Sequence, residues 1–180
     1  MARSSTTDMA VLGLLALGAK TGYDIRQECE EKLSHFWQES YGQIYPAFAR
    51  LHKKGWVHKE TETGKAPMKH LYSLTDEGRE VLKKWFSDPV QLSPPRNELL
   101  LKLFLGRMAD HADLAEVIQR YTHEYEHHLS ALVRISEATK SEATEHPDAP
   151  YRLITLDYGI RMIRTRVEWA KDAEKIIREL

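Results

Sequence analysis

The sequence predicts a mainly α-helical protein with one small β-hairpin, divided into two domains. Helical periodicity runs through most of the chain, and β-capable runs occur only between residues 56 and 74. A stretch rich in proline and serine near residue 90 separates two periodic segments and is typical of a connector. We therefore expect an N-terminal domain over residues 1–88, a linker over 89–97 and an all-α domain over 98–180.

The N-terminal half begins with three expected helices. The N-cap of the first is one of three consecutive polar residues, Thr6, Thr7 or Asp8. A second helix is expected at roughly 23–33. The third must start at about Gln43 to Tyr45, because Pro46 is tolerated only in a first turn, and Gly55 ends it.

Two short strand-like runs follow, Trp56 to Thr61 and Lys69 to Leu74, and a loop that contains glycine and proline separates them. A fourth helix opens at Thr75 to Glu77. Three helices, a hairpin and a further helix are the order of a winged helix-turn-helix. In that fold the third helix is the candidate recognition helix and the hairpin is the wing.

The second half has no strand signal. A short apolar helix over about Glu98 to Met108 precedes a heptad-like seam from Leu114 to Ile135, and a last helix covers about Tyr151 to Leu180. Two long amphipathic helices must bury their apolar stripes against each other and against a second chain. We therefore expect a helical dimerisation domain and a homodimer.

Composition excludes several classes of protein. The 180 residues include 26 basic and 27 acidic side chains, a near neutrality that would ordinarily argue against nucleic acid. A single cysteine, Cys29, permits neither an intramolecular disulfide nor a four-cysteine zinc site, and it fits a cytoplasmic location. The longest apolar run, Met9 to Ala19, is about half of the ~20 residues that span a bilayer, so we expect no membrane partner.

Charge is nevertheless unevenly distributed. Between residues 50 and 72, six basic side chains stand against only Glu60 and Glu62. The cations are Arg50, Lys53, Lys54, Lys59, Lys65 and Lys69. Gln43 and Tyr45 lie at the start of the third helix, where backbone N–H groups can also face phosphate. DNA phosphates interact with this local basic patch and not with the total charge of the chain. Double-stranded DNA is therefore the expected partner.

Several motifs have a familiar spacing. They are Thr21-Gly22-Tyr23-Asp24-Ile25, Gln43-Ile44-Tyr45-Pro46, Gly55-Trp56-Val57, Tyr72-Ser73-Leu74-Thr75-Asp76-Glu77-Gly78, Asn97-Glu98-Leu99 and Glu168-Trp169-Ala170. With them, nearly the whole chain resembles the PadR-like transcriptional regulators that carry a long helical C-terminal domain, including the AphA type.

The resemblance implies a dimeric DNA-binding regulator, often a repressor, that binds an inverted-repeat operator and can be relieved by a small aromatic (phenolic) effector. Carried over by position, Tyr41, Gln43, Tyr45 and Arg50 would lie at the DNA surface, and Lys65 and Lys69 would lie in the wing.

Effector residues are less well defined. Tyr23, Trp37 and Trp169 are pocket candidates, although aromatic side chains at helical spacing more often pack a core or an interface. Arg161, Arg164 and Arg166 either pair with acidic residues of a neighbouring helix or form an anion site for a carboxylate effector.

No set of residues supports catalysis, so we expect neither an enzyme nor a cofactor. His123 and His127 are spaced to share a metal, but a third ligand at suitable spacing is missing, and no metal site is predicted. The competing class is a protein-interaction scaffold, in which the winged helix binds another protein and not specific DNA.

Overall fold

The computed structural model describes residues 5–18, 20–37, 41–61, 70–90, 96–141 and 146–180. The chain forms two compact units, Met1–Leu92 and Ser93–Leu180, and each is described by itself. The expected linker, 89–97, falls partly on residues 91–95, which lie outside the described ranges.

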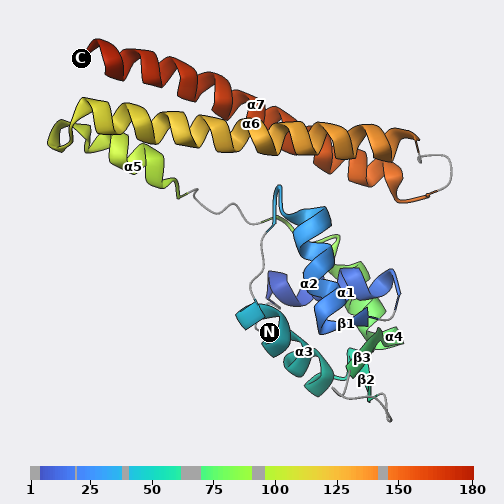
Figure 1. The fold of residues 1–180 in the computed structure, drawn as a ribbon. Helices are drawn as coiled ribbons and strands as arrows, with labels where there is room; N and C mark the ends of the chain where they lie inside the picture. Colours follow the sequence, from blue (N-terminus) through green and yellow to red (C-terminus); the bar gives the residue numbers. More distant parts are fainter. Residues whose placement is uncertain (1–4, 19, 38–40, 62–69, 91–95, 142–145) are drawn as a thin grey trace. The chain divides into compact units, whose positions relative to one another are not determined.

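The first unit holds four α-helices and a small sheet among its described residues (Figure 1). Its elements are α1 (Thr6–Ala16), β1 (Lys20–Thr21), α2 (Gly22–Glu28), a π-helical turn (Cys29–Leu33), α3 (Tyr41–Lys53), β2 (Val57–Thr61), β3 (His70–Leu74) and α4 (Asp76–Trp85). The sheet is antiparallel with the strand order β1-β3-β2. Val57 of β2 faces Leu74 of β3, and Lys20 of β1 faces Tyr72 of β3.

The core of this unit lies between α1, α3 and the sheet. Every element of the unit except β1 contributes a buried apolar side chain, and the α1 and α3 residues are almost completely covered. Phe48 of α3 stacks on Tyr72 of β3, with ring centroids 4.0 Å apart. Burial at this level contributes about 1.5–3 kcal/mol for each large apolar side chain, so packing on α1 and β3 fixes the position of α3.

The prediction of a mainly helical fold with a small hairpin is confirmed, and the structure adds three details. The two-residue strand β1 had no signal of its own, because it pairs with β3 across about fifty residues of sequence. The second helix becomes a π-helical turn after Glu28. The third helix starts at Tyr41, so the prediction that Pro46 lies in its first turn is wrong. Pro46 cannot donate to the carbonyl of Gly42, and Gly42 is exposed, so that carbonyl can bind solvent instead.

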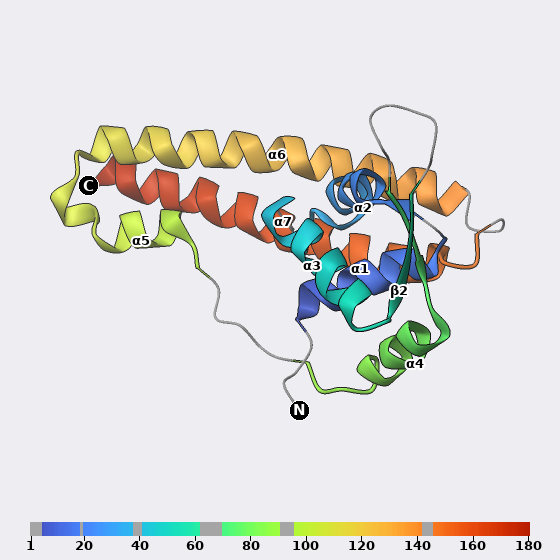
Figure 2. The same cartoon turned by 90° about the horizontal axis from the view of Figure 1, so that it is seen from below.

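The second unit is helical throughout its described residues. It contains α5 (Glu98–Phe104), a 3-10 turn (Gly106–Met108), α6 (His111–Ser141) and α7 (Ala149–Glu179). Figures 1 and 2 show the two long helices side by side, with α5 near the end where α6 begins. No described helix is both long and apolar enough to cross a membrane.

Two apolar clusters hold α6 and α7 together. One is formed by Leu132, Leu156, Ile163 and Val167, and the other joins Leu99 of α5 to Ile118 and Ala170. Much of the predicted seam on α6 therefore packs against other helices of the same chain, and its residues Leu114 and Ile118 are buried. Its last member, Ile135, remains 38% exposed.

Gly78, at the start of α4, is a test of local packing. A Cβ at this position would lie against the backbone carbonyl of Trp56, well inside the 3.0 Å below which real Cβ contacts are essentially never found. The same carbonyl accepts a hydrogen bond from the N–H of Thr75 at 3.1 Å, so any shift of the carbonyl would weaken this hydrogen bond. We expect Gly78→Ala to lower the free energy of unfolding by about 2 kcal/mol, measured by urea denaturation.

Gly13→Ala is the matched control, because a Cβ at Gly13 meets nothing within 4 Å. Gly13 lies inside α1, where alanine is the better helix former, so this variant should gain about 0.5–1 kcal/mol. Equal stability of the two variants would contradict the packing argument.

Candidate nucleic-acid interface

The outer face of α3 is set by the face that it buries. Ile44, Ala47, Phe48 and Leu51 are no more than 1% exposed, and they fall on one side of the helix. Since each residue of an α-helix turns by about 100°, the opposite side carries Ala49 and Lys53. One flank, spaced i, i+7 and i+11, carries Gln43, Arg50 and Lys54. The other flank carries Tyr45 and His52, and all of these side chains are exposed.

Tyr45 rests on the start of α2. A Cβ at Gly22, the first residue of α2, would lie 2.8 Å from Cε1 of the Tyr45 ring, so only glycine lets the ring lie this close. Tyr45 keeps half of its surface exposed. Tyr45 also affects Tyr72 of β3. Burial raises the pKa of the Tyr72 hydroxyl, and the nearby Tyr45 hydroxyl raises this pKa further. The ring of Tyr45 is thus held in place while its surface stays available.

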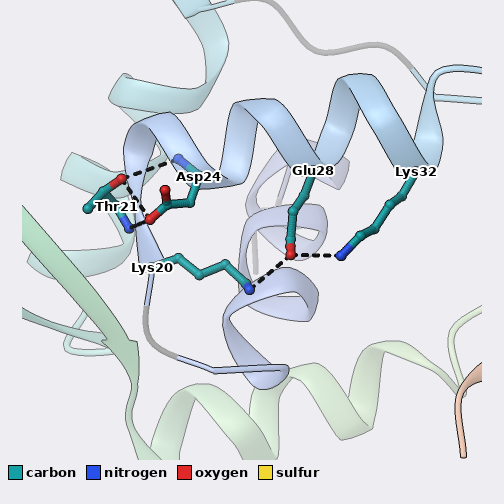
Figure 3. Close-up of polar contacts among 5 residues, drawn as sticks. All are labelled: Lys20, Thr21, Asp24, Glu28 and Lys32. Carbon is teal, nitrogen blue, oxygen red and sulfur yellow. Dashed lines mark hydrogen bonds and ion pairs between the residues drawn. The ribbon is translucent and has the colours of Figure 1, made fainter. Parts of the chain in front are cut away.

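The start of α2 is itself fixed by a capping box (Figure 3). The Thr21 hydroxyl oxygen accepts from the N–H of Asp24 at 3.2 Å, and the Asp24 carboxylate accepts from the N–H of Thr21 at 2.8 Å. These two bonds satisfy backbone donors that the first turn would otherwise leave unpaired. Gly22, which supports Tyr45, lies between the two capping residues.

Further along the same helix, Glu28 binds two lysines through one oxygen (Figure 3). Its Oε1 lies 3.0 Å from Nζ of Lys20 and 2.8 Å from Nζ of Lys32. Burial raises the pKa of Glu28, but the hydrogen bonds from Lys32 and Lys20 outweigh it and hold the pKa below its ordinary value. These pairs tie β1 and the π-helical turn to α2.

The C-terminal end of α3 is held by a carboxylate of α1. Asp8 is only 1% exposed. Its Oδ1 accepts from Nη2 of Arg50 at 2.6 Å and from Nε at 3.1 Å, and its Oδ2 lies 3.4 Å from Nζ of Lys54. A buried carboxylate is stable only when it is paired in this way. Lys54 also lies over the ring of Trp56, 4.4 Å from its centroid.

The structure brings part of the predicted DNA-binding set together on α3 and the residue directly after it, namely Gln43, Tyr45, Arg50, Lys53 and Lys54. Tyr41 is the first residue of α3, but its side chain is not among those described. The two wing lysines, Lys65 and Lys69, lie outside the described residues.

The three aromatic effector candidates do not come from one unit. Tyr23 is 60% exposed on α2 and Trp37 is half-buried after the π-helical turn, whereas Trp169 is 37% exposed on α7 of the other unit. A groove of about 510 Å³ lies between α6 and α7, and none of the three lines it.

Arg161, Arg164 and Arg166, the anion-site candidates, all lie on α7, and two of them have partners among the described residues. Arg161 pairs with Asp157 at 2.8 Å, and Arg166 donates to the Tyr125 hydroxyl at 3.2 Å. Arg161 and Arg164 both line the groove between α6 and α7. Among the described residues, no three His, Cys, Asp or Glu side chains are placed to share a metal ion.

Asp8 and Gly22 are the residues that the sequence reasoning missed. The sequence predicts Asp8 only as one of three N-cap candidates, yet it stands four residues before Leu12 and seven before Leu15, on the buried stripe of α1. A carboxylate on an apolar stripe is a signal for a buried ion pair, because it is otherwise too costly to bury. Gly22 carries no comparable signal, since its contact with Tyr45 depends on how α2 meets α3.

In the first unit, α2 and α3 are followed by the antiparallel hairpin of β2 and β3, and α3 buries one face in the core. This arrangement defines a winged-helix protein of the DNA-binding class. Two family models agree with this fold. Residues 11–84 match the transcriptional regulator PadR-like family, and residues 95–178 match the virulence activator alpha C-terminal family.

Known relatives cover nearly the whole chain. The negative transcriptional regulator PadR of Bacillus subtilis is 27% identical over 87% of this chain and 85% of its own length. The crystal structure of B. subtilis PadR in complex with operator DNA matches with a TM-score of 0.81 and 25% identity, over 96% of this chain and 99% of that one. B. subtilis PadR in complex with p-coumaric acid matches with a TM-score of 0.72 and 24% identity, over 97% and 99% of the two chains.

The chain thus carries a PadR-like transcriptional regulator domain over residues 11–84 and a virulence-activator C-terminal domain over residues 95–178. The predicted family resemblance and the winged-helix fold are thereby confirmed.

The Glu28 pairs give a pH-dependent prediction. A lowered pKa means that the folded chain holds this carboxylate charged more easily than the unfolded chain does. The contribution to stability is therefore present above the ordinary pKa of 4.5 and is lost as the pH falls through the folded value. We expect Glu28→Gln to lower the free energy of unfolding by about 1 kcal/mol at pH 7, with a smaller difference from wild type near pH 3.

Urea denaturation at both pH values measures this difference. Glu31→Gln, an exposed site three residues away that forms no ion pair among the described residues, is the control and should change little at either pH. A Glu28→Gln effect that is as large at pH 3 as at pH 7 would show that packing, not charge, is responsible.

Proposed function

We propose that this chain is a sequence-specific DNA-binding transcriptional regulator that acts as a homodimeric repressor on an inverted-repeat operator in the cytoplasm. The observation that carries the proposal is the outer face of α3, where Gln43, Tyr45 and Lys53 are exposed while the opposite face is buried. A helix of this kind can enter a major groove with its first residues near the base edges. The relative crystallised with operator DNA supports the same use of the fold.

The proposed DNA contacts divide into two kinds. Tyr41, Gln43 and Tyr45 lie at the start of α3 and contact bases or phosphates. Arg50, Lys53 and Lys54 at the end of the helix, with Lys65 and Lys69 in the wing, contact phosphates. Phosphate contacts supply affinity and orientation, and base contacts supply sequence discrimination.

We further propose that residues 1–88 bind DNA and that residues 98–180 form the dimer. The second unit leaves large apolar side chains exposed on α5, on the 3-10 turn and on α7 after its own clusters have formed. They include Leu101, Phe104, Met108, Ile154, Tyr158 and Ile176, each more than half exposed. Large exposed apolar side chains in this number favour a protein–protein contact. A two-fold dimer would place two copies of α3 on half-sites about one DNA turn apart.

An aromatic effector is a further element of the proposal. It rests on the relative that binds p-coumaric acid and on the family resemblance. Tyr23, Trp37 and Trp169 remain the proposed contacts. A protein-interaction scaffold is the competing function. It predicts an ordered dimer that binds no specific DNA.

DNA binding is tested by gel shift on the DNA upstream of the chain's own gene, with competitor DNA at physiological salt. The wild-type chain should bind this fragment in preference to a scrambled one. Lys65→Ala/Lys69→Ala should weaken binding and reduce the slope of log affinity against log salt by about two, because each lost phosphate contact removes about one.

The matched control is Lys83→Ala/Lys84→Ala, which removes the same charge from exposed lysines of α4, outside α3 and the wing. It should leave the slope near the wild-type value. If both double variants reduce the slope equally, the loss follows the charge removed and not a contact made by the wing. If an ordered wild-type dimer binds no specific DNA, the scaffold function is favoured.

The dimer is tested by sedimentation of the full chain with Phe104→Asp/Met108→Asp. Both side chains are more than 85% exposed, so the change should leave the fold of one chain intact and shift the protein towards monomer. Val90→Asp, at an equally exposed apolar residue of the first unit, should remain dimeric. A dimer that resists the double substitution would exclude Phe104 and Met108 from the interface.

A further inference from the structure

The last turn of α3 carries three cations that differ in what holds them. Arg50 and Lys54 share the buried carboxylate of Asp8, at 2.6 Å and 3.4 Å. Lys53, between them in sequence, is exposed and forms no ion pair within the described residues. The three positive charges are therefore not equivalent, although a sequence pattern counts them equally.

The contacts with Asp8 leave Arg50 and Lys54 partly accessible. Their side chains are 45% and 39% exposed, whereas Asp8 is 1% exposed. Arg50 uses Nε and Nη2 for the carboxylate, so the guanidinium plane has a fixed direction while other donors of the same group remain outside. Lys54 is further restricted by its position over Trp56.

A fixed cation and a mobile cation act differently on DNA. A mobile lysine can follow the phosphates of any duplex, because phosphate contacts are independent of sequence. A guanidinium with a fixed plane satisfies phosphate geometry only when the helix approaches in one orientation. Holding cations in place should therefore reduce binding to random DNA more than binding to the operator.

We propose that Asp8 is a positioning residue that sets the DNA specificity of α3 by holding Arg50 and Lys54 in one arrangement. The proposal rests on the DNA-binding function proposed above and assigns a role to a residue that itself faces the core and not the DNA. Asp8 also removes one positive charge from the end of α3, which lowers the affinity for DNA of any sequence.

The test compares Asp8→Asn with Asp76→Asn in the full chain. Both substitutions remove one negative charge, but Asp76 is exposed in the first turn of α4 and binds neither Arg50 nor Lys54. Affinities are measured against salt for the DNA upstream of the chain's own gene and for a scrambled duplex of the same length. Circular dichroism checks that each variant is folded.

We expect Asp8→Asn to bind scrambled DNA more tightly, with a salt slope steeper by about one to two, as freed Arg50 and Lys54 make new phosphate contacts. The ratio of specific to scrambled affinity should fall by roughly tenfold, the scale of one well-placed contact. Asp76→Asn should keep the wild-type ratio and slope. Equal ratios and slopes for the two folded variants would overturn the role of Asp8.

A second pair covers the case in which Asp8→Asn does not fold. Lys53→Gln and Lys54→Gln each remove one charge from adjacent positions and leave Asp8 paired with Arg50. On scrambled DNA, Lys53→Gln should reduce the salt slope by about one, while Lys54→Gln should leave it almost unchanged. Equal losses for the two variants would overturn the proposal.

DNA binding by the wild-type chain separates a failure of the proposed function from a failure of the role of Asp8. A wild-type chain that does not prefer its upstream DNA overturns the proposed function and the role of Asp8 with it. A wild-type chain that does prefer this DNA, with variants that behave alike, overturns only the role of Asp8.

Discussion

The burial of one face of α3 is the constraint on which the first unit depends. Ile44, Phe48 and Leu51 are covered by α1 and the sheet, and this packing leaves the helix no freedom to rotate. The polar and charged face is therefore presented outwards as a consequence of core packing. The side chains available on the surface of α3 are therefore those that its packing in the core leaves uncovered.

Two close contacts refine this arrangement on the flanks of α3. Gly22 lets the Tyr45 ring lie against the start of α2, and Asp8 draws Arg50 towards α1. The first contact depends on the absence of a side chain, and the second depends on a buried charge. Each joins α3 to a different helix, so both flanks are fixed independently of the apolar core.

The sequence predicts the order of elements well because that order is local. Gly55 ends α3 with a φ of +75°, which glycine adopts easily. Two short β-capable runs on either side of a loop with glycine and proline predict the hairpin of β2 and β3. The strand β1 and the pair of Asp8 with Arg50 were missed because both join residues far apart in the chain, 42 positions in the case of the ion pair. Periodicity within one segment carries no information about its distant partner. The predicted start of α3 is wrong for another reason. Solvent can bind the carbonyl of Gly42, which receives no hydrogen bond from Pro46.

The π-helical turn at Cys29–Leu33 affects how this chain is compared with its relatives. Such a turn closes with a hydrogen bond to the fifth residue and not the fourth, so it accommodates one more residue than an α-helical turn. The residues that directly follow it are offset by about the 100° that one helical residue contributes. A relative that lacks this turn would reach the same place in space with one residue fewer. An alignment of α2 with that relative would need a one-residue gap at this turn, within a helix, where insertions are usually penalised.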